Sequence, residues 1–157
     1  MFSRDDVISG SGPLYSAMSE AEVARALEEL QTIERIVADL QARILSVQRS
    51  MAEHEEAVKL IEEIRKSGGK MKILVPLGAG AFAEATLESV EKVTVSLGAG
   101  VYAVKALEDT QQLLTKRSQG LQAYSEILAK RVSEYVARAE ELRRFLGQVL
   151  AAQPRQG

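Results

Sequence analysis

Apolar residues recur at alternating steps of three and four along the first part of the chain, from Val23 onward. This heptad repeat keeps one register, which is typical of a helix that buries a narrow stripe against another helix. Ser19 and Glu22 form a capping-box pattern before it, and Gly68 and Gly69 follow it. We therefore predict a first coiled-coil helix over residues 19–67. Its a and d positions are Val23, Ala26, Leu30, Ile33, Val37, Leu40, Ile44, Val47, Met51, His54, Val58 and Ile61.

A second heptad repeat occupies the last part of the chain and predicts a helix over residues 107–152. Because each narrow stripe needs a partner and the other stripe is the nearest, an antiparallel helical hairpin is expected. A compact helical bundle is the alternative. The d positions are Leu107, Leu114, Leu121, Leu128, Tyr135, Leu142 and Val149, and the a positions are Gln111, Ser118, Ser125, Val132, Ala139 and Leu146.

Between the two repeats, over residues 71–106, the period changes to the alternation of β-strands. Two apolar runs each enter a Leu-Gly-Ala-Gly segment and continue as a second short run, over residues 81–87 and 101–106. The two copies align at an offset of twenty residues. This pattern predicts a duplicated β-hairpin.

The repeated Gly-Ala-Gly segment has two interpretations, a phosphate-binding loop or a tight turn. A phosphate loop needs Gly-Lys-Ser/Thr or a third glycine followed by a helix, and neither copy has them. Turns need glycine only for a positive φ angle, so two turns are favoured and no cofactor is expected. Pro76 should lie at a sheet edge or at a non-paired position.

Composition and charge exclude several classes of function. The net charge of −2 leaves no broad basic face for a nucleic acid, and the absence of cysteine excludes disulfides and thiolate metal sites. With one histidine and no clustered ligands or nucleophile motif, neither an enzyme nor a metal protein is expected. We interpret His54 as a tolerated polar residue of the seam. No signal peptide or membrane-spanning run is evident, so a cytoplasmic protein is expected.

The order of these features resembles the α subunit of prefoldin. The resemblance covers Val23 to Val149 and rests on a heptad helix, "ILVPLGAGAF", "VTVSLGAG" and a second heptad helix. Two hairpins distinguish the α type from the single-hairpin β type. The resemblance implies a hexamer of two α and four β subunits, with a double β-barrel and six projecting coiled coils. It also implies an ATP-independent chaperone that captures unfolded proteins and delivers them to a group II chaperonin.

The expected fold is therefore α+β, a long antiparallel coiled-coil helical hairpin whose connecting end carries two β-hairpins that join an intersubunit β-barrel. Residues 19–152 should form one domain, preceded by a flexible extension over 1–18 and followed by a tail over 153–157. The residues expected to mediate oligomerisation are Ile73, Val75, Leu77, Gly78, Gly80, Phe82, Val93, Val95, Leu97, Gly98, Gly100 and Tyr102.

The free end of such a hairpin, where both termini meet, is the expected site for unfolded clients, because apolar residues need not be fully covered there. Leu142, Leu146 and Val149 can equally be the last layers of the coil, whereas Phe145 and Leu150 lie off the seam. The candidates are Val7, Ile8, Leu14, Tyr15, Met18, Val23, Leu27, Leu142, Phe145, Leu146, Val149 and Leu150.

Two other functions stay open on the sequence. A prefoldin-like chain can assemble with itself, as a homo-oligomer or filament, through the same hairpins. A structural coiled-coil spacer without chaperone activity is the third reading. Mixing with a β-type subunit distinguishes the heterohexameric chaperone subunit from the self-assembling protein. Suppression of client aggregation would exclude the spacer.

Overall fold

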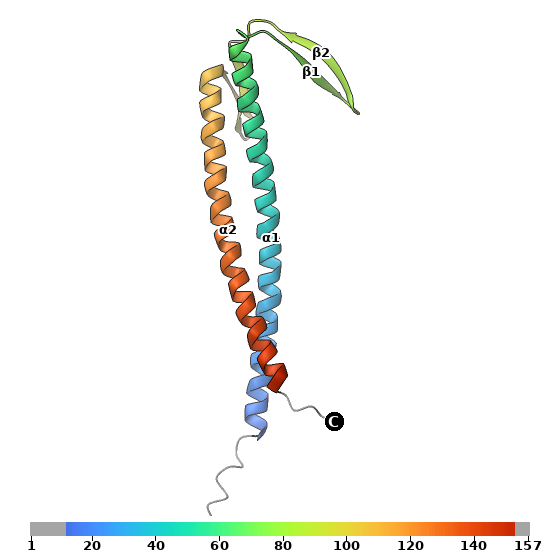
Figure 1. Cartoon of the computed structure of the whole chain (residues 1–157), viewed down its shortest axis with the longest axis vertical. Coiled ribbons are helices and arrows are strands. Elements are labelled where there is room, and N and C mark those ends of the chain that lie inside the picture. The colour runs from blue at the N-terminus through green and yellow to red at the C-terminus, as the bar shows by residue number, and fades with distance from the viewer. Residues whose placement is uncertain (1–11, 153–157) are drawn as a thin grey trace, which may run out of the picture. The chain divides into compact units, whose positions relative to one another are not determined.

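The computed structural model describes the backbone of residues 12–152 and the side chains of residues 20–152. Along the chain, four strands lie between two long helices, in the order α1, β1, β2, β3, β4, α2 (Figure 1). The bounds are α1 Gly12–Lys66, β1 Met71–Gly78, β2 Ala81–Leu87, β3 Lys92–Gly98, β4 Val101–Ala106 and α2 Leu107–Ala152. The predicted α+β fold of two long helices and two antiparallel β-hairpins is confirmed. Neither helix has, in its described residues, a stretch apolar enough to cross a bilayer.

The start of α1 differs from the expectation. Helix α1 begins at Gly12, seven residues before Ser19, within the segment expected to be a flexible extension. Pro13 falls in the first turn, where its fixed φ suits a helix and its missing N–H is not needed. The apparent capping box at Ser19 therefore lies inside the helix.

The structure divides into two compact units, which we describe separately. The helical unit holds the described residues up to Arg43 and from Ile127 onward, and the hairpin unit is Ile44–Glu126. Within the helical unit, α1 and α2 run antiparallel and bury predicted heptad positions. One buried cluster of this unit consists of Ala26, Ile33, Ala139, Leu142 and Leu146, with Val23, Leu30, Val37 and Tyr135 packed against it.

The hairpin unit has its own apolar cluster where the bases of both hairpins meet the helix ends. Ile61, Ile64 and Leu107 are buried there. Residues of β1, β2, the connection between the hairpins, β3 and α2 pack around them, namely Met71, Leu87, Val90, Val93 and Leu114. The cluster fixes the base of each hairpin while leaving its distal half to project.

Helix α1 ends in a Schellman motif. The N–H of Gly69 donates to the C=O of Ile64 at 2.8 Å, and the N–H of Gly68 donates to the C=O of Arg65 at 3.2 Å. Both glycines have positive φ, which the motif requires at Gly68. The Gly69 carbonyl then accepts from the N–H of Val90 at 3.0 Å, which ties the helix end to the connection between the hairpins.

The two hairpins have the same turn geometry. In each, a two-residue loop carries positive φ at both positions, Ala79 (51°) with Gly80 (77°) and Ala99 (50°) with Gly100 (76°). This is the pattern of a type I′ turn, whose twist matches that of the flanking strands. A register shift lies just before each loop, between Pro76 and Gly78 in the first hairpin and between Ser96 and Gly98 in the second. The turn interpretation of the Gly-Ala-Gly segments is confirmed.

Candidate interaction surfaces

Each β-hairpin is an isolated two-stranded sheet with two open edges. Strand β1 pairs only with β2, and β3 pairs only with β4. Such sheets are marginal in water and offer unpaired N–H and C=O groups to further strands. The four strands therefore present a surface suited to β-pairing with other chains.

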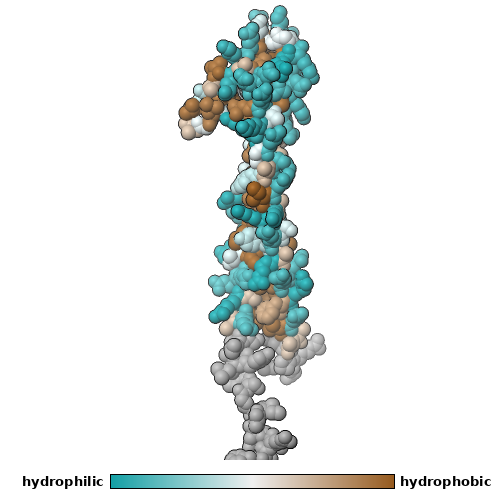
Figure 2. Space-filling model, turned by 90° about the vertical axis from the view of Figure 1, so that its left-hand side faces the viewer, coloured by the Kyte–Doolittle hydropathy of each residue, from teal (hydrophilic) through white to brown (hydrophobic). Residues whose placement is uncertain are grey.

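Large apolar side chains of the hairpins are exposed as well. Figure 2 shows hydrophobic side chains gathered on a lobe that projects from the helical part of the hairpin unit. Phe82 is 60% exposed and Tyr102 is 66% exposed, although both are large enough to contribute strongly to burial in an interface. The exposed set is Leu74, Val75, Leu77, Phe82, Leu97, Val101, Tyr102 and Val104.

The predicted oligomerisation residues divide by exposure. Val75, Leu77, Phe82, Leu97 and Tyr102 are exposed, together with the four turn and bulge glycines Gly78, Gly80, Gly98 and Gly100. Ile73 and Val93 are half-buried, and Val95 is buried within the hairpin unit itself. Val95 thus already contributes to the fold of the single chain.

Sequence reasoning missed three exposed apolar residues of the hairpins, Leu74, Val101 and Val104. Leu74 pairs with Glu84 and lies on the face opposite Val75. The signal was present, since strand alternation places Leu74 and Pro76 on one face and Ile73 and Val75 on the other, and both sets are apolar. Apolar residues therefore lie on both faces of the first hairpin.

The apolar residues expected to bind clients differ in exposure within the helical unit. Leu27, Phe145 and Leu150 are exposed, with Leu150 at 66%. Val23 and Val149 are half-buried. Leu142 and Leu146 lie in the buried core, which favours the alternative that they are layers of the coil. Val7 and Ile8 lie outside the described residues, and Leu14, Tyr15 and Met18 lie in α1 without described side chains.

Ion pairs join the two helices of the helical unit. The Arg138 guanidinium donates to both carboxylate oxygens of Glu29, with Nε–Oε1 2.7 Å and Nη2–Oε2 3.2 Å, and also donates to Glu141. Arg143 donates to Glu34 at 2.9 Å. The hydrogen bond from Arg138 lowers the pKa of Glu29 below its ordinary value, and the same pair raises the pKa of Arg138. Because these contacts are solvent-exposed, they add little to the free energy of folding. Their main effect is on the alignment of the two helices, which the bidentate geometry sets.

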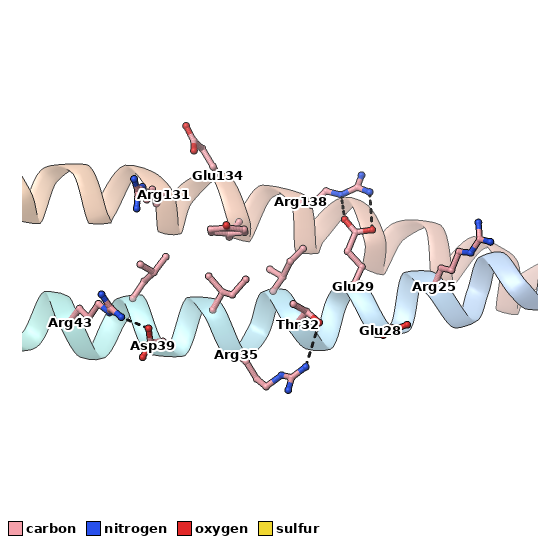
Figure 3. A pocket seen from close by; sticks show the side chains of 14 residues that line it. Arg25, Glu28, Glu29, Thr32, Arg35, Asp39, Arg43, Arg131, Glu134 and Arg138 are labelled. Carbon is pink, nitrogen blue, oxygen red and sulfur yellow. Dashed lines mark hydrogen bonds and ion pairs between the residues drawn. The ribbon is translucent and has the colours of Figure 1, made fainter.

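A groove of about 1400 Å³ runs between the helices in this unit (Figure 3). Its apolar floor includes Ile33, Ile36 and Tyr135, and charged side chains of both signs stand along its walls. The walls alternate in charge, so the groove favours neither an anion nor a cation. It is an open stretch of the coiled-coil surface.

His54 contacts the backbone of its own helix. Its Nδ1 lies 2.6 Å from the backbone carbonyl of Ser50, one helical turn earlier, and the ring is half-buried. The described residues contain no group of three or more metal-ligating side chains. The nearby seam is loosely filled, with a groove of about 660 Å³ where Met51 and Val58 face the small and polar residues Ser118 and Ala123.

These features define a class of protein, a helical-hairpin subunit that carries two β-hairpins with open edges and exposed apolar faces. The family model described as "Prefoldin subunit" matches residues 33–152, which cover the later part of α1, all four strands and the whole of α2. The chain belongs to the prefoldin family.

Similar proteins agree with this assignment. The chain is 28% identical over 118 residues to the prefoldin subunit alpha of Thermofilum pendens, covering 75% of this chain and 92% of that relative. It is 32% identical over 93 residues to the prefoldin subunit alpha of Pyrobaculum islandicum, covering 48% of this chain and 70% of that relative. The cryo-EM structure of filamentous PFD from Methanocaldococcus jannaschii shares the fold, with a TM-score of 0.63, 22% identity, and coverage of 74% of this chain and 97% of that one. The chain is thus an α-type prefoldin subunit by sequence likeness.

Proposed function

We propose that this chain is the α-type subunit of a hetero-oligomeric chaperone, two copies of which assemble with four β-type prefoldin subunits. The observation that carries the proposal is the pair of hairpins, each with two open edges and an exposed apolar surface. Closing these hairpins into a β-barrel with those of other subunits would satisfy the edges and cover the apolar faces.

In this proposal the apolar residues of the helical unit contact unfolded clients. Leu27, Phe145 and Leu150 are the strongest candidates because they are exposed in a unit whose seam is otherwise packed. Single weak contacts suffice when several subunits act together, because a shared platform raises the overall affinity by about 10² to 10⁴. Val7, Ile8, Leu14, Tyr15, Met18, Val23 and Val149 remain further candidates.

The proposed activity is that of a holdase. Capturing a non-native chain requires apolar contact and no covalent step, so we expect neither ATP hydrolysis nor another enzymatic reaction. Transfer of the client to a group II chaperonin in the cytosol is proposed from the family resemblance.

Suppression of client aggregation tests this function. The chain is first assembled with a β-type prefoldin subunit, and light scattering of a chemically denatured client is then followed after dilution into the complex. Near-stoichiometric complex should suppress the scattering. Phe145→Glu and Leu150→Glu should each weaken suppression by roughly threefold to tenfold, because each puts a charge where apolar burial is needed.

Leu45→Glu serves as the matched control. Leu45 is 64% exposed, which is nearly the exposed fraction of Leu150, but Leu45 belongs to the hairpin unit. This variant should suppress aggregation like the wild type. No suppression by the wild-type complex would refute the chaperone function and leave the spacer reading, whereas equal losses for all three variants would refute the assignment of the client surface.

A second candidate function is self-assembly. Both hairpins share one turn geometry and one register shift, so a hairpin of one copy can replace that of a partner in strand pairing. The fold likeness to a filamentous prefoldin supports this candidate. Indifference of the oligomer to an added β-type subunit would favour it over the heterohexamer.

A further inference from the structure

Pro76 and Ser96 occupy equivalent positions in the two hairpins. Pro76 pairs with Phe82 and Ser96 pairs with Tyr102, and each is the last paired residue before the register shift. The two residues are also separated by the twenty-residue offset of the duplication. What holds for the backbone direction of one therefore holds for the other.

The backbone of this position points away from the paired strand. In an antiparallel sheet the N–H and C=O of one residue face the same side, and proline is found where no ladder donor is needed. The position of Pro76 thus faces the outer edge of β1. In agreement, the carbonyl of Ser96 accepts a hydrogen bond from Arg117 Nη2 at 2.9 Å instead of serving β4.

The outer edges of β1 and β3 are therefore blocked at the same point by different means. At Pro76 the edge lacks a donor, and at Ser96 the edge acceptor is occupied by a side chain from α2. In the described structure, no side chain hydrogen-bonds the backbone of β2. The one such bond to β4 is at its last residue, where Thr110 donates to Ala106. Of the two unpaired edges of each hairpin, those of β2 and β4 are thus the ones without such an obstruction.

We infer that Pro76 and Arg117 hinder strand pairing along the outer edges of β1 and β3. A hairpin strand of a second subunit therefore adds first along β2 or β4. Arg117 must release Ser96 before a strand can pair along the whole of β3. The identity of the incoming subunit rests on the proposed function. The protection of the edges is a property of the single chain and is testable without a β-type partner.

The test measures how fast the isolated full-length chain associates after rapid dilution from denaturant, by light scattering at several protein concentrations. The occupant of the edge is then a second copy of this chain. Arg117→Ala should raise the association rate by roughly twofold to tenfold, the range expected for removing one hydrogen bond that is exposed to solvent. Pro76→Ser, which gives β1 the residue found at the equivalent point of β3, should also raise it.

Two further variants make the result specific. Lys116→Ala removes a neighbouring charge on α2 and should behave as the wild type, and Arg117→Lys keeps a donor and should lie between the wild type and Arg117→Ala. Hydrogen exchange of residues 92–106 should be faster in Arg117→Ala, because the carbonyl that ties β3 to α2 is released. Unchanged or slower association of Arg117→Ala, or an equal increase in Lys116→Ala, would overturn the inference. The ability of the wild type to join β-type subunits is unaffected by either result.

Discussion

At the scale of single residues, glycine meets two different needs in this chain. At Gly69 an added Cβ would lie 2.7 Å from the nitrogen of Val90, and the φ angle is +81°. At Gly80 the space is open and only the positive φ of 77° requires glycine. At Gly120, inside α2, neither requirement exists.

The same substitution should therefore have opposite effects at two glycines of the hairpin unit. Gly69→Ala should destabilise the fold by at least about 1–2 kcal/mol, because it adds left-handed strain to a clash with backbone atoms. Gly120→Ala should stabilise it by about 0.5–1 kcal/mol, since alanine has the higher helix propensity. Urea unfolding followed by circular dichroism measures both. Equal effects of the two substitutions would contradict the geometry described at Gly69.

The pair of Glu29 and Arg138 gives the helical unit a pH dependence. Hydrogen bonding to Arg138 lowers the pKa of Glu29 in the folded state. The contribution of this ion pair to the stability of the fold is therefore complete above the ordinary glutamate pKa, about 4.3. It is lost as the pH falls through the lower, folded-state pKa. Thermal unfolding between pH 3 and pH 7 should show a smaller acid destabilisation in Glu29→Gln than in the wild type.

A charge exchange separates this pair from a general charge effect. Glu29→Arg and Arg138→Glu should each lower the unfolding temperature slightly, and the double variant should recover most of the loss. Added salt should shrink all these differences, because the pair is exposed. Failure of the double variant to recover would show that the pair does not set the alignment of the helices.

At the scale of elements, the two hairpins are copies of one design with a small strain left in each turn. Ala79 and Ala99 adopt φ angles of 51° and 50°, which alanine disfavours and asparagine tolerates. The duplication keeps this strain in both copies. The turns are thus the part of each hairpin where a substitution can raise the stability most.

Asparagine at these positions should stabilise the turns. Ala79→Asn and Ala99→Asn each create the Asn-Gly sequence favoured in type I′ turns, with an expected gain of about 0.5 kcal/mol per turn. Because the hairpins are separate sheets, the two gains should be additive. Chemical denaturation of the single and double variants measures this. A loss of stability in either single variant would contradict the assigned turn type.

Most elements could be predicted from the sequence because their boundaries coincide with a change of period. Strand β4 and helix α2 have the bounds expected from the point where alternation gives way to a heptad, and β2 has the bounds expected for the short run that follows the first Gly-Ala-Gly. The start of α1 could not be predicted, because Ser19 resembles a cap while Pro13 is equally acceptable in a first turn. The contact of Arg117 with Ser96 also escaped prediction, since it depends on how β3 packs on α2 and not on any local pattern.

At the scale of the whole molecule, the two units differ in the apolar surface that they expose. The helical unit is held by a packed seam and keeps a few exposed apolar side chains, whereas the hairpin unit exposes apolar residues on both faces of two-stranded sheets. The heptad register put Leu142 and Leu146 on the seam and Leu150 off it, and the first two are buried whereas Leu150 is exposed. The register alone could not show whether Leu142 and Leu146 are covered by the other helix or left free for a client, because that depends on where the two helices meet.

Hairpin side chains should control assembly without affecting the coil. Phe82→Glu and Tyr102→Glu put a charge on exposed positions of the two hairpins, so the single chain should keep its helical content. Both variants should weaken association with other subunits, because an unpaired charge in a covered interface is costly. The same substitution at Tyr124, which is 42% exposed on α2, is the matched control and should assemble normally.

The native mass of the purified chain, alone and mixed with a β-type prefoldin subunit, tests the central claim most directly. The account predicts one defined complex in the mixture, with two copies of this chain and four of the partner, and its loss for Phe82→Glu. A mass that does not change when the partner is added, or a full complex formed by Phe82→Glu, would contradict it.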